Sequence, residues 1–225
     1  MKLKNNFYQL TNVNEDSAEL FIYGDITSYK LYEDDVCAYD MAKELESLGG
    51  KSLKVRINSY GGEVAQGLAI YNLLKSYAGE VTTLCDGFAC SAASVIFMAG
   101  KNRLMPKSSL LMIHNAWTYA SGDANALRKI ADEIEKITQP SVEIYKNAST
   151  LSEEEIKKMM DDETWITADE ALSYGFATEI AEDSPKQSLR DEMFAKIVLR
   201  NKELEKEKNK ITKEPAKEKE DGWFF

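Results

Sequence analysis

The sequence is poor in the residues that would build a metal centre or a disulfide framework. Its 225 residues include one histidine, His114, and three cysteines, Cys37, Cys85 and Cys90, which form no C-x-x-C pair. A single histidine excludes any metal site with two histidine ligands. The odd number of cysteines and their spacing disfavour both a zinc site and a disulfide framework. We therefore expect buried free thiols, and no metal or cofactor.

Long apolar runs and an excess of positive charge are also lacking. The longest apolar run, around residues 89–99, is shorter than the roughly 20 residues that a membrane-spanning helix needs. The N-terminus carries no pattern typical of a secretion signal, so we predict a cytoplasmic protein without membrane contact. The net charge of −10 disfavours nucleic acid as a partner, because phosphates would be repelled.

The distribution of charge suggests where the chain divides. From Arg200 onward, eight Lys and Arg residues stand against seven Asp and Glu residues, and no apolar face appears before Trp223. Such a segment buries too little apolar surface to offset its loss of conformational entropy, so we expect a solvated helix or disorder. The predicted parts are an N-terminal segment (1–18), a folded domain (19–183), a C-terminal helix (184–199) and this tail (200–225).

Strand and helix patterns alternate along the folded domain. Strands are expected at 19–26, 53–58, 80–85, 103–105 and 109–114, and helices at 34–48, 63–77, 85–100 and 122–149, the last interrupted at Pro140. Capping boxes at Ser152–Glu155 and Thr167–Glu170 predict two further helix starts. This order predicts an α/β fold with a mostly parallel sheet and helices packed on it.

The stretch "CDGFACSAASVIFMAG" (85–100) carries two serines, Ser91 and Ser94. Its small residues are typical of a closely packed helix, and they equally suit the presentation of a nucleophile. His114 ends the apolar stretch "LLMIH", at a position where α/β sheets place their ligand crevice. We interpret it as a candidate general base, the alternative being a hydrogen-bonded histidine with a structural role only.

The order of residues limits the kinds of serine hydrolase that fit. No Asp or Glu occurs between Ala92 and Ile113, so the α/β-hydrolase order of serine, acid and histidine is excluded if Ser91 or Ser94 is the nucleophile. The chymotrypsin-like and subtilisin-like orders would need a serine after the histidine, such as Ser121 or Ser141. The remaining order is serine, histidine and then an acid further along the chain.

Four motifs in this order resemble the Clp peptidase family of self-compartmentalising serine proteases: "INSYGGEVAQGLAIYNLL", "GFACSAASVIFMAG", "LLMIHN" and "ETWITADEALSYGF". The resemblance covers about residues 19–182, and the wording is most similar to the phage and prophage head-maturation branch. It implies a Clp/crotonase-like fold, in which residues 19–183 form the catalytic domain. It also implies a protruding helical handle between His114 and Glu163.

The resemblance assigns roles to five residues. Ser91, the last residue of "GFACS", would be the nucleophile, His114 the general base and Glu163 the acid that orients it. The backbone N–H groups of Gly62 and Ala92 would form the oxyanion hole. Ser94 matches no catalytic position of the family.

Three positions leave alternatives open. Many members of the family carry aspartate where this chain has Glu163, and Asp162 is the second candidate for the acid. Tyr60 stands where the family usually has proline, which leaves the stiffness of the Gly-Gly loop open. Cys90 precedes Ser91 directly and is the alternative nucleophile.

The resemblance implies a serine endopeptidase that works through an acyl-enzyme, without metal or cofactor, as a homo-oligomer of stacked rings. The main hypothesis is a head-maturation protease that cleaves coat or scaffold protein. The alternative is a housekeeping Clp proteolytic subunit that works with a separate unfolding ATPase. Two further alternatives are a crotonase-type acyl-CoA enzyme and a catalytically silent assembly protein.

Overall fold

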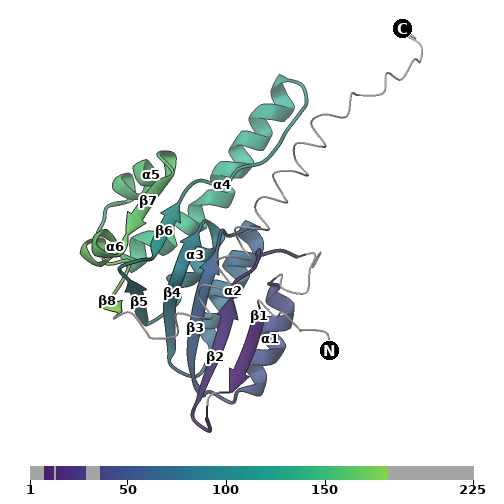
Figure 1. The fold of residues 1–225 in the computed structure, drawn as a ribbon. Coiled ribbons are helices and arrows are strands. Elements are labelled where there is room, and N and C mark those ends of the chain that lie inside the picture. The colour runs from purple at the N-terminus through teal and green to yellow at the C-terminus, as the bar shows by residue number, and fades with distance from the viewer. Residues whose placement is uncertain (1–7, 13, 29–35, 182–225) are drawn as a thin grey trace, which may run out of the picture. The chain divides into compact units, whose positions relative to one another are not determined.

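A computed structural model describes residues 8–12, 14–28 and 36–181 of the chain (Figure 1). The predicted C-terminal helix and charged tail lie outside these residues, as does part of the N-terminal segment. The strands are β1 (Tyr8–Asn12), β2 (Ser17–Ile22), β3 (Ser52–Ser59), β4 (Val81–Cys90), β5 (Asn102–Pro106), β6 (Leu110–Ile113), β7 (Thr164–Thr167) and β8 (Glu179–Ala181). The helices are α1 (Ala38–Ser47), α2 (Val64–Ser76), α3 (Ala92–Phe97), α4 (Ala124–Ala148), α5 (Glu153–Asp161) and α6 (Ala168–Tyr174).

All eight described strands belong to one sheet, and most neighbours run parallel. The sheet order is β1-β2-β3-β4-β5-β8, with β6 beside β4 and β7 beside β6. Only β1 with β2 and β6 with β7 are antiparallel among the described pairs. The strand pairings confirm the predicted α/β fold with a mostly parallel sheet. Parallel strands need crossover connections, and the helices between them return the chain to the end of the sheet where the next strand begins.

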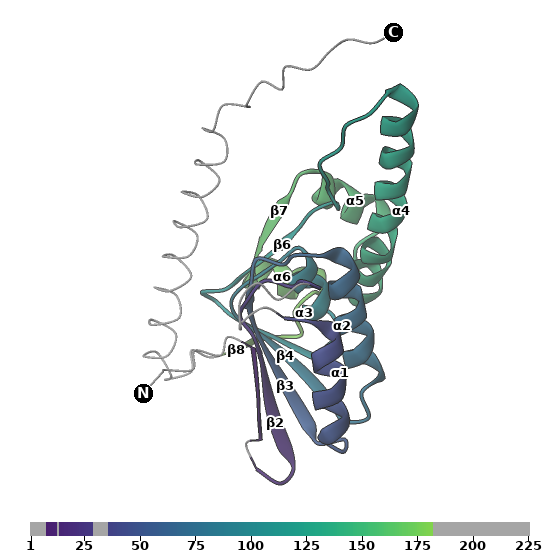
Figure 2. The ribbon, with the colours of Figure 1, turned by 90° about the vertical axis from the view of Figure 1, so that its right-hand side faces the viewer.

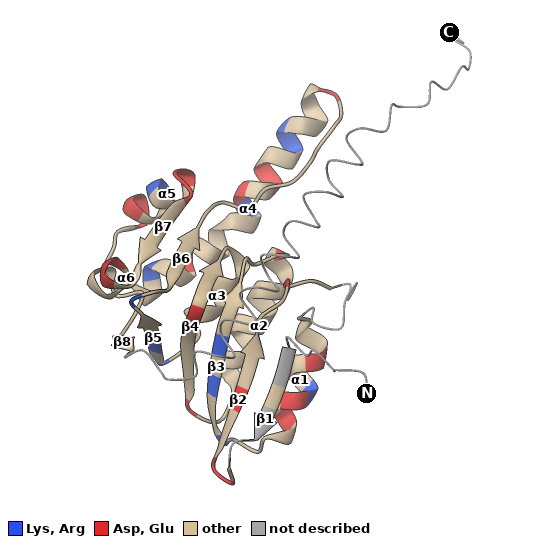
Figure 3. Cartoon of the chain, in the orientation of Figure 1, with Lys and Arg blue, Asp and Glu red and all other residues tan. Residues whose placement is uncertain are grey.

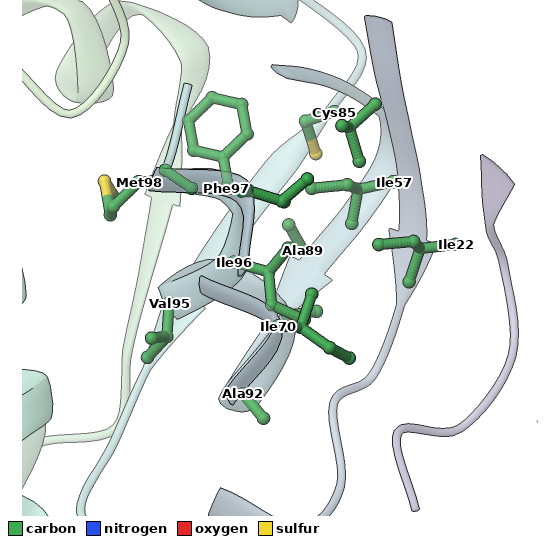
Figure 4. Packing of buried hydrophobic residues seen from close by; sticks show 14 of the residues in the cluster. Ile22, Ile57, Ile70, Cys85, Ala89, Ala92, Val95, Ile96, Phe97 and Met98 are labelled. Carbon is green, nitrogen blue, oxygen red and sulfur yellow. The ribbon is translucent and has the colours of Figure 1, made fainter. Parts of the chain in front are cut away.

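Helices α1 and α2 cover one face of the sheet formed by β2, β3 and β4 (Figure 2). Alternate residues of β2 and β3 point into this face, and Leu20, Ile22, Val55 and Ile57 are fully buried there. Figure 4 shows Ile22 and Ile57 near Ile70 of α2 in this core. The period-two burial explains why 53–58 could be predicted as a strand from its sequence alone.

The opposite side of the same strands carries a polar cluster. The Arg56 guanidinium forms two hydrogen bonds of 2.7 Å with the Asp86 carboxylate, and the Tyr23 hydroxyl donates a third at 2.5 Å. Hydrogen bonding to Asp86 raises the pKa of Arg56 above its usual range, so this side chain stays charged although it is largely buried. The cluster connects β3 to β4 just before the segment that leads to Ser91.

The prediction of a helix over 85–100 is wrong for its first half. Strand β4 continues to Cys90, and α3 begins only at Ala92. The first half of β4 pairs with β5, and its second half, from Phe88 to Cys90, pairs with β6. Because this second pairing partner comes from a distant segment, the local pattern of small residues could not reveal the strand.

A second correction concerns Pro140. Helix α4 continues through this proline from Ala124 to Ala148, so the predicted interruption is absent. An interior proline costs about 3 kcal/mol of helix stability, because one backbone hydrogen bond is lost. The helix tolerates it because its C-terminal half buries Val142 and Tyr145 against the body of the protein. Its N-terminal half extends away from the sheet, as expected for the handle (Figure 1).

Other predicted boundaries shift by a few residues. The first predicted strand, 19–26, corresponds to β2, which ends at Ile22, and the helix predicted at 34–48 is described from Ala38. Both predicted capping boxes are present: Ser152 with Glu155 opens α5, and Thr167 with Glu170 opens α6. Strands β7 and β8 were not predicted, because four and three residues give too short a pattern.

We predict that Arg56→Ala lowers the free energy of unfolding by about 3–5 kcal/mol, because it leaves the buried Asp86 carboxylate without its cation. The matched control is Lys101→Ala, which removes a salt bridge with Glu80 whose side chains are 74% and 48% exposed. We expect this control to cost less than about 1 kcal/mol. Denaturant unfolding measures both values, and equal losses in the two variants would contradict a structural role for the cluster.

Candidate active site

Ser91 lies at a sharp turn between β4 and α3, in a backbone conformation that side chains other than glycine rarely adopt. Its φ is 54° and its ψ is −126°. A non-glycine residue in such a region costs on the order of 1–3 kcal/mol and is typical of functional sites. The N–H of Ser91 donates to the Met112 carbonyl at 2.9 Å, which ties the turn to β6. A sharp strand-to-helix turn also exposes the nucleophilic serine of α/β-hydrolases.

The register between β4 and β6 brings His114 to Ser91. Cys90 pairs with Met112 in the parallel ladder, so the residues that follow leave the sheet at the same edge. The Nε2 atom of His114 lies 2.7 Å from the Ser91 Oγ, which is hydrogen-bond distance. The structure therefore joins the predicted nucleophile and the predicted base directly.

Burial of the imidazole lowers the pKa of His114 below its ordinary value of 6.5, and the negative charge of Glu163 opposes this shift. Three of the elements next to the pair carry no charged residue. α3, β6 and β7 contain no Lys, Arg, Asp or Glu and are drawn tan throughout (Figure 3). A neutral histidine can accept the hydroxyl proton, as a general base must.

The three consecutive carboxylates at the end of α5, Asp161 to Glu163, face different partners. Asp162 pairs with Lys158 at 2.6 Å, and Asp161 accepts a hydrogen bond of 2.7 Å from the Asn115 side chain. Glu163 follows with a φ of 48°, and its charge acts on His114. The antiparallel pairing of Ile113 with Thr164 places Glu163 beside His114.

This arrangement favours Glu163 over Asp162 as the orienting acid. Within the described residues, no hydrogen bond joins Glu163 to His114. Catalytic hydrogen bonds often tighten only when substrate binds, so the apo geometry is compatible with the role.

The Gly61-Gly62 loop packs against the turn that carries Ser91. A Cβ on Gly61 would come within 2.6 Å of the Cys90 carbonyl oxygen. Gly62 has a φ of 147°, and a Cβ there would lie 2.1 Å from the Ile26 carbonyl oxygen, so only glycine fits at either position.

The predicted oxyanion hole needs backbone N–H groups at Gly62 and Ala92 that can donate to a substrate. The Ile26 N–H donates to the Gly61 carbonyl, and the Glu63 N–H donates to the Ile26 carbonyl. The N–H of Gly62, which lies between these two residues, takes no part in this pairing. Ala92 is the first residue of α3, where backbone N–H groups lack an acceptor within the helix.

Ser94 has hydrogen-bond partners other than His114. Its hydroxyl donates to the Ser91 carbonyl at 2.7 Å and lies 2.8 Å from the Tyr145 hydroxyl. Since the single Ser94 hydrogen goes to the carbonyl, Tyr145 must be the donor in the second bond. Tyr145 therefore supports the nucleophile turn from α4. Tyr145 was not predicted as part of the site, because its partner Ser94 is 51 positions away in the sequence and local patterns do not reveal such a contact.

Cys90, the alternative nucleophile, is poorly suited to the role. Its side chain is fully buried, and burial raises the pKa of its thiol to about 12. A thiol with this pKa carries almost no thiolate near neutral pH, and the thiolate is the reactive form.

The described part of the chain contains no group of three or more His, Cys, Asp or Glu residues that could hold a metal ion. It also contains no helix that is long and apolar enough to cross a membrane.

Comparison with known families gives a match over most of the chain. The family model described as Clp protease matches residues 4–184. The chain belongs to the Clp protease family. The family-level resemblance of the four sequence motifs is thereby confirmed, and the mostly parallel fold agrees with it.

Several curated members of the Clp protease family align with the chain, each named "ATP-dependent Clp protease proteolytic subunit". The protein from Bacteroides fragilis is 36% identical over 134 residues, which are 58% of this chain and 64% of the relative. The one from Porphyromonas gingivalis is 34% identical over 139 residues, which are 61% of this chain and 63% of the relative. The one from Deinococcus radiodurans is 32% identical over 136 residues, which are 60% of this chain and 67% of the relative. The first two alignments span less than two thirds of the relatives' length.

We predict that peptidase activity falls as the pH drops through a pKa below 6.5, because His114 must be neutral to accept a proton and burial lowers its pKa. Glu163→Gln removes the charge that favours the imidazolium, so the falling limb should move to still lower pH while the maximal rate decreases. The matched control is Asp162→Asn, whose profile should coincide with the wild type. A pH–rate profile of kcat/KM on assembled protein measures this, and a limb above pH 6.5 would contradict the argument.

Proposed function

We propose that this chain is a serine-type peptidase, which cleaves peptide bonds through an acyl-enzyme at Ser91. The observation that carries the proposal is the 2.7 Å contact between Ser91 Oγ and His114 Nε2 at a strained strand-to-helix turn. Membership of the Clp protease family supports it. Neither a metal nor a cofactor is required for this chemistry.

In the proposed reaction, His114 accepts the hydroxyl proton while the Ser91 oxygen attacks the scissile carbonyl. The N–H groups of Gly62 and Ala92 stabilise the negative charge on the carbonyl oxygen. The imidazolium then gives its proton to the leaving amine, and the peptide bond breaks. Water hydrolyses the ester by the same steps. Glu163 stabilises the imidazolium through its charge and does not itself become protonated.

Two biological roles fit this activity. The names of the aligned relatives favour a Clp proteolytic subunit that works with a separate ATPase. The head-maturation role, with coat or scaffold protein as substrate, stays a prediction that no comparison supports. We expect a homo-oligomer of stacked rings in either role, with α4 as the element through which rings meet.

The two other classes fit less well. A crotonase-type acyl-CoA enzyme needs backbone oxyanion donors and has no use for a serine–histidine pair at a strained turn. A catalytically silent assembly protein has no use for it either. Coenzyme A binding by the purified protein, together with a lack of peptide hydrolysis, would favour the first of these classes.

The test is labelling with a fluorophosphonate probe, which reacts with activated serines. We expect a single labelled site at Ser91, and Ser91→Ala should abolish labelling without loss of the folded assembly. Ser94→Ala serves as the matched control and should still be labelled at Ser91. Labelling that persists in Ser91→Ala and disappears in Ser94→Ala would overturn the assignment. Inhibition by iodoacetamide should likewise be absent in the wild type, because Cys90 is buried.

A further inference from the structure

A small cavity opens beside the Ser91–His114 pair. Its volume is about 20 Å³, and its walls come from α2, α3, α4, α5 and the segment after β6. A cavity needs roughly 10–15 Å³ of this volume to hold one water molecule. The space next to the nucleophile therefore accommodates one group about the size of a methyl or a hydroxymethyl.

The walls of this cavity are held in place by the core. Met160 and Tyr145 are each 1% exposed and Val95 is 4% exposed. The Tyr145 hydroxyl is fixed by its bond to Ser94. On the opposite wall, α2 packs so closely on α3 that a Cβ on Gly67 would lie 2.8 Å from the Ala92 Cβ. Widening the cavity for a leucine side chain would require these groups to move.

One polar group in the wall is left for a ligand. Ser141 is only 8% exposed, and its hydroxyl has no hydrogen-bond partner among the residues that the structure describes. The neighbouring Thr138 hydroxyl is occupied, because it donates to the Ile134 carbonyl at 2.9 Å and accepts from the Ala116 N–H at 3.2 Å. No fully buried side-chain oxygen among the described residues lacks a hydrogen-bond partner, so the Ser141 oxygen is open to the cavity that it lines and can bond to a polar group that enters.

We propose that the cavity receives the side chain of the P1 residue, which carries the scissile carbonyl, and restricts it to alanine or serine. The Ser141 hydroxyl hydrogen-bonds to the hydroxyl of a P1 serine. The acyl part of the substrate stays attached to Ser91 after the amine leaves, so a cavity walled by Ser91 and Ala92 suits the acyl side of the bond. This inference rests on the proposed function, and it specifies the class of substrate.

Fluorogenic peptides that differ only in the residue before an aminocoumarin leaving group test the inference. With this leaving group, the varied residue is P1 by definition. We expect kcat/KM for alanine and serine to exceed that for leucine and phenylalanine by at least about tenfold, the selectivity that a size-limited pocket provides. Equal or faster cleavage after leucine would overturn the inference.

Variants of the cavity wall test the roles of its residues. Ser141→Ala should lower the serine-to-alanine ratio of kcat/KM by about fivefold to tenfold, the effect of one net hydrogen bond. The control Ser121→Ala, on the exposed segment before α4, should leave the ratio unchanged. Met160→Ala should raise the leucine-to-alanine ratio by about tenfold. If it fails to fold, Val64→Ala in the same wall serves instead. Unchanged ratios in both Ser141→Ala and the wall variant would contradict the proposal.

Fluorophosphonate labelling of the same preparations separates this inference from the proposed function. A protein labelled at Ser91 that prefers leucine at P1 remains a serine peptidase, and only the specificity proposal fails. A protein that is neither labelled nor active on any peptide overturns both.

Discussion

The candidate site depends on one strand pairing, that of the second half of β4 with β6. This pairing places Cys90 opposite Met112 and lets Ser91 and His114 leave the sheet together. The Asn58 side chain supports it from β3, because its oxygen accepts the Phe88 N–H at 3.1 Å where the β3–β4 register shifts. The antiparallel partner β7 then adds Glu163 beside His114. Three segments far apart in the sequence thus supply the three predicted catalytic side chains.

The surroundings of the pair determine what it can do. Burial keeps the imidazole neutral, the Gly61-Gly62 loop brings backbone groups against the serine turn, and Ser94 with Tyr145 holds the Ser91 carbonyl. These contacts come from the loop between β3 and α2, from α3 and from α4. The strained turn at Ser91 leads directly into α3, whose residues are all buried, so packing of the core holds the turn in its conformation. Fold stability and the geometry of the site therefore have the same origin.

The sequence predicted Ser91, His114, Glu163 and the Gly62 loop because motifs with fixed spacing carry them. It failed at Cys85–Cys90, where small and apolar residues satisfy both a helix and a strand pattern, and only the distant β6 decides between them. It also failed at Pro140, where tertiary burial of Val142 and Tyr145 outweighs a local penalty. The unpartnered Ser141 hydroxyl and the Tyr145–Ser94 bond depend on contacts between helices, which local patterns do not encode.

The central claim is that Ser91 and His114 act as one catalytic pair. A peptidyl chloromethyl ketone tests it most directly, because the reagent alkylates a histidine only when a neighbouring serine has first bound its carbonyl. Peptide mapping of treated protein should find the modification at His114, and Ser91→Ala should slow it by about a hundredfold or more, the scale of loss on removing a catalytic group. Alkylation of His114 at equal rates in the wild type and in Ser91→Ala would contradict the account.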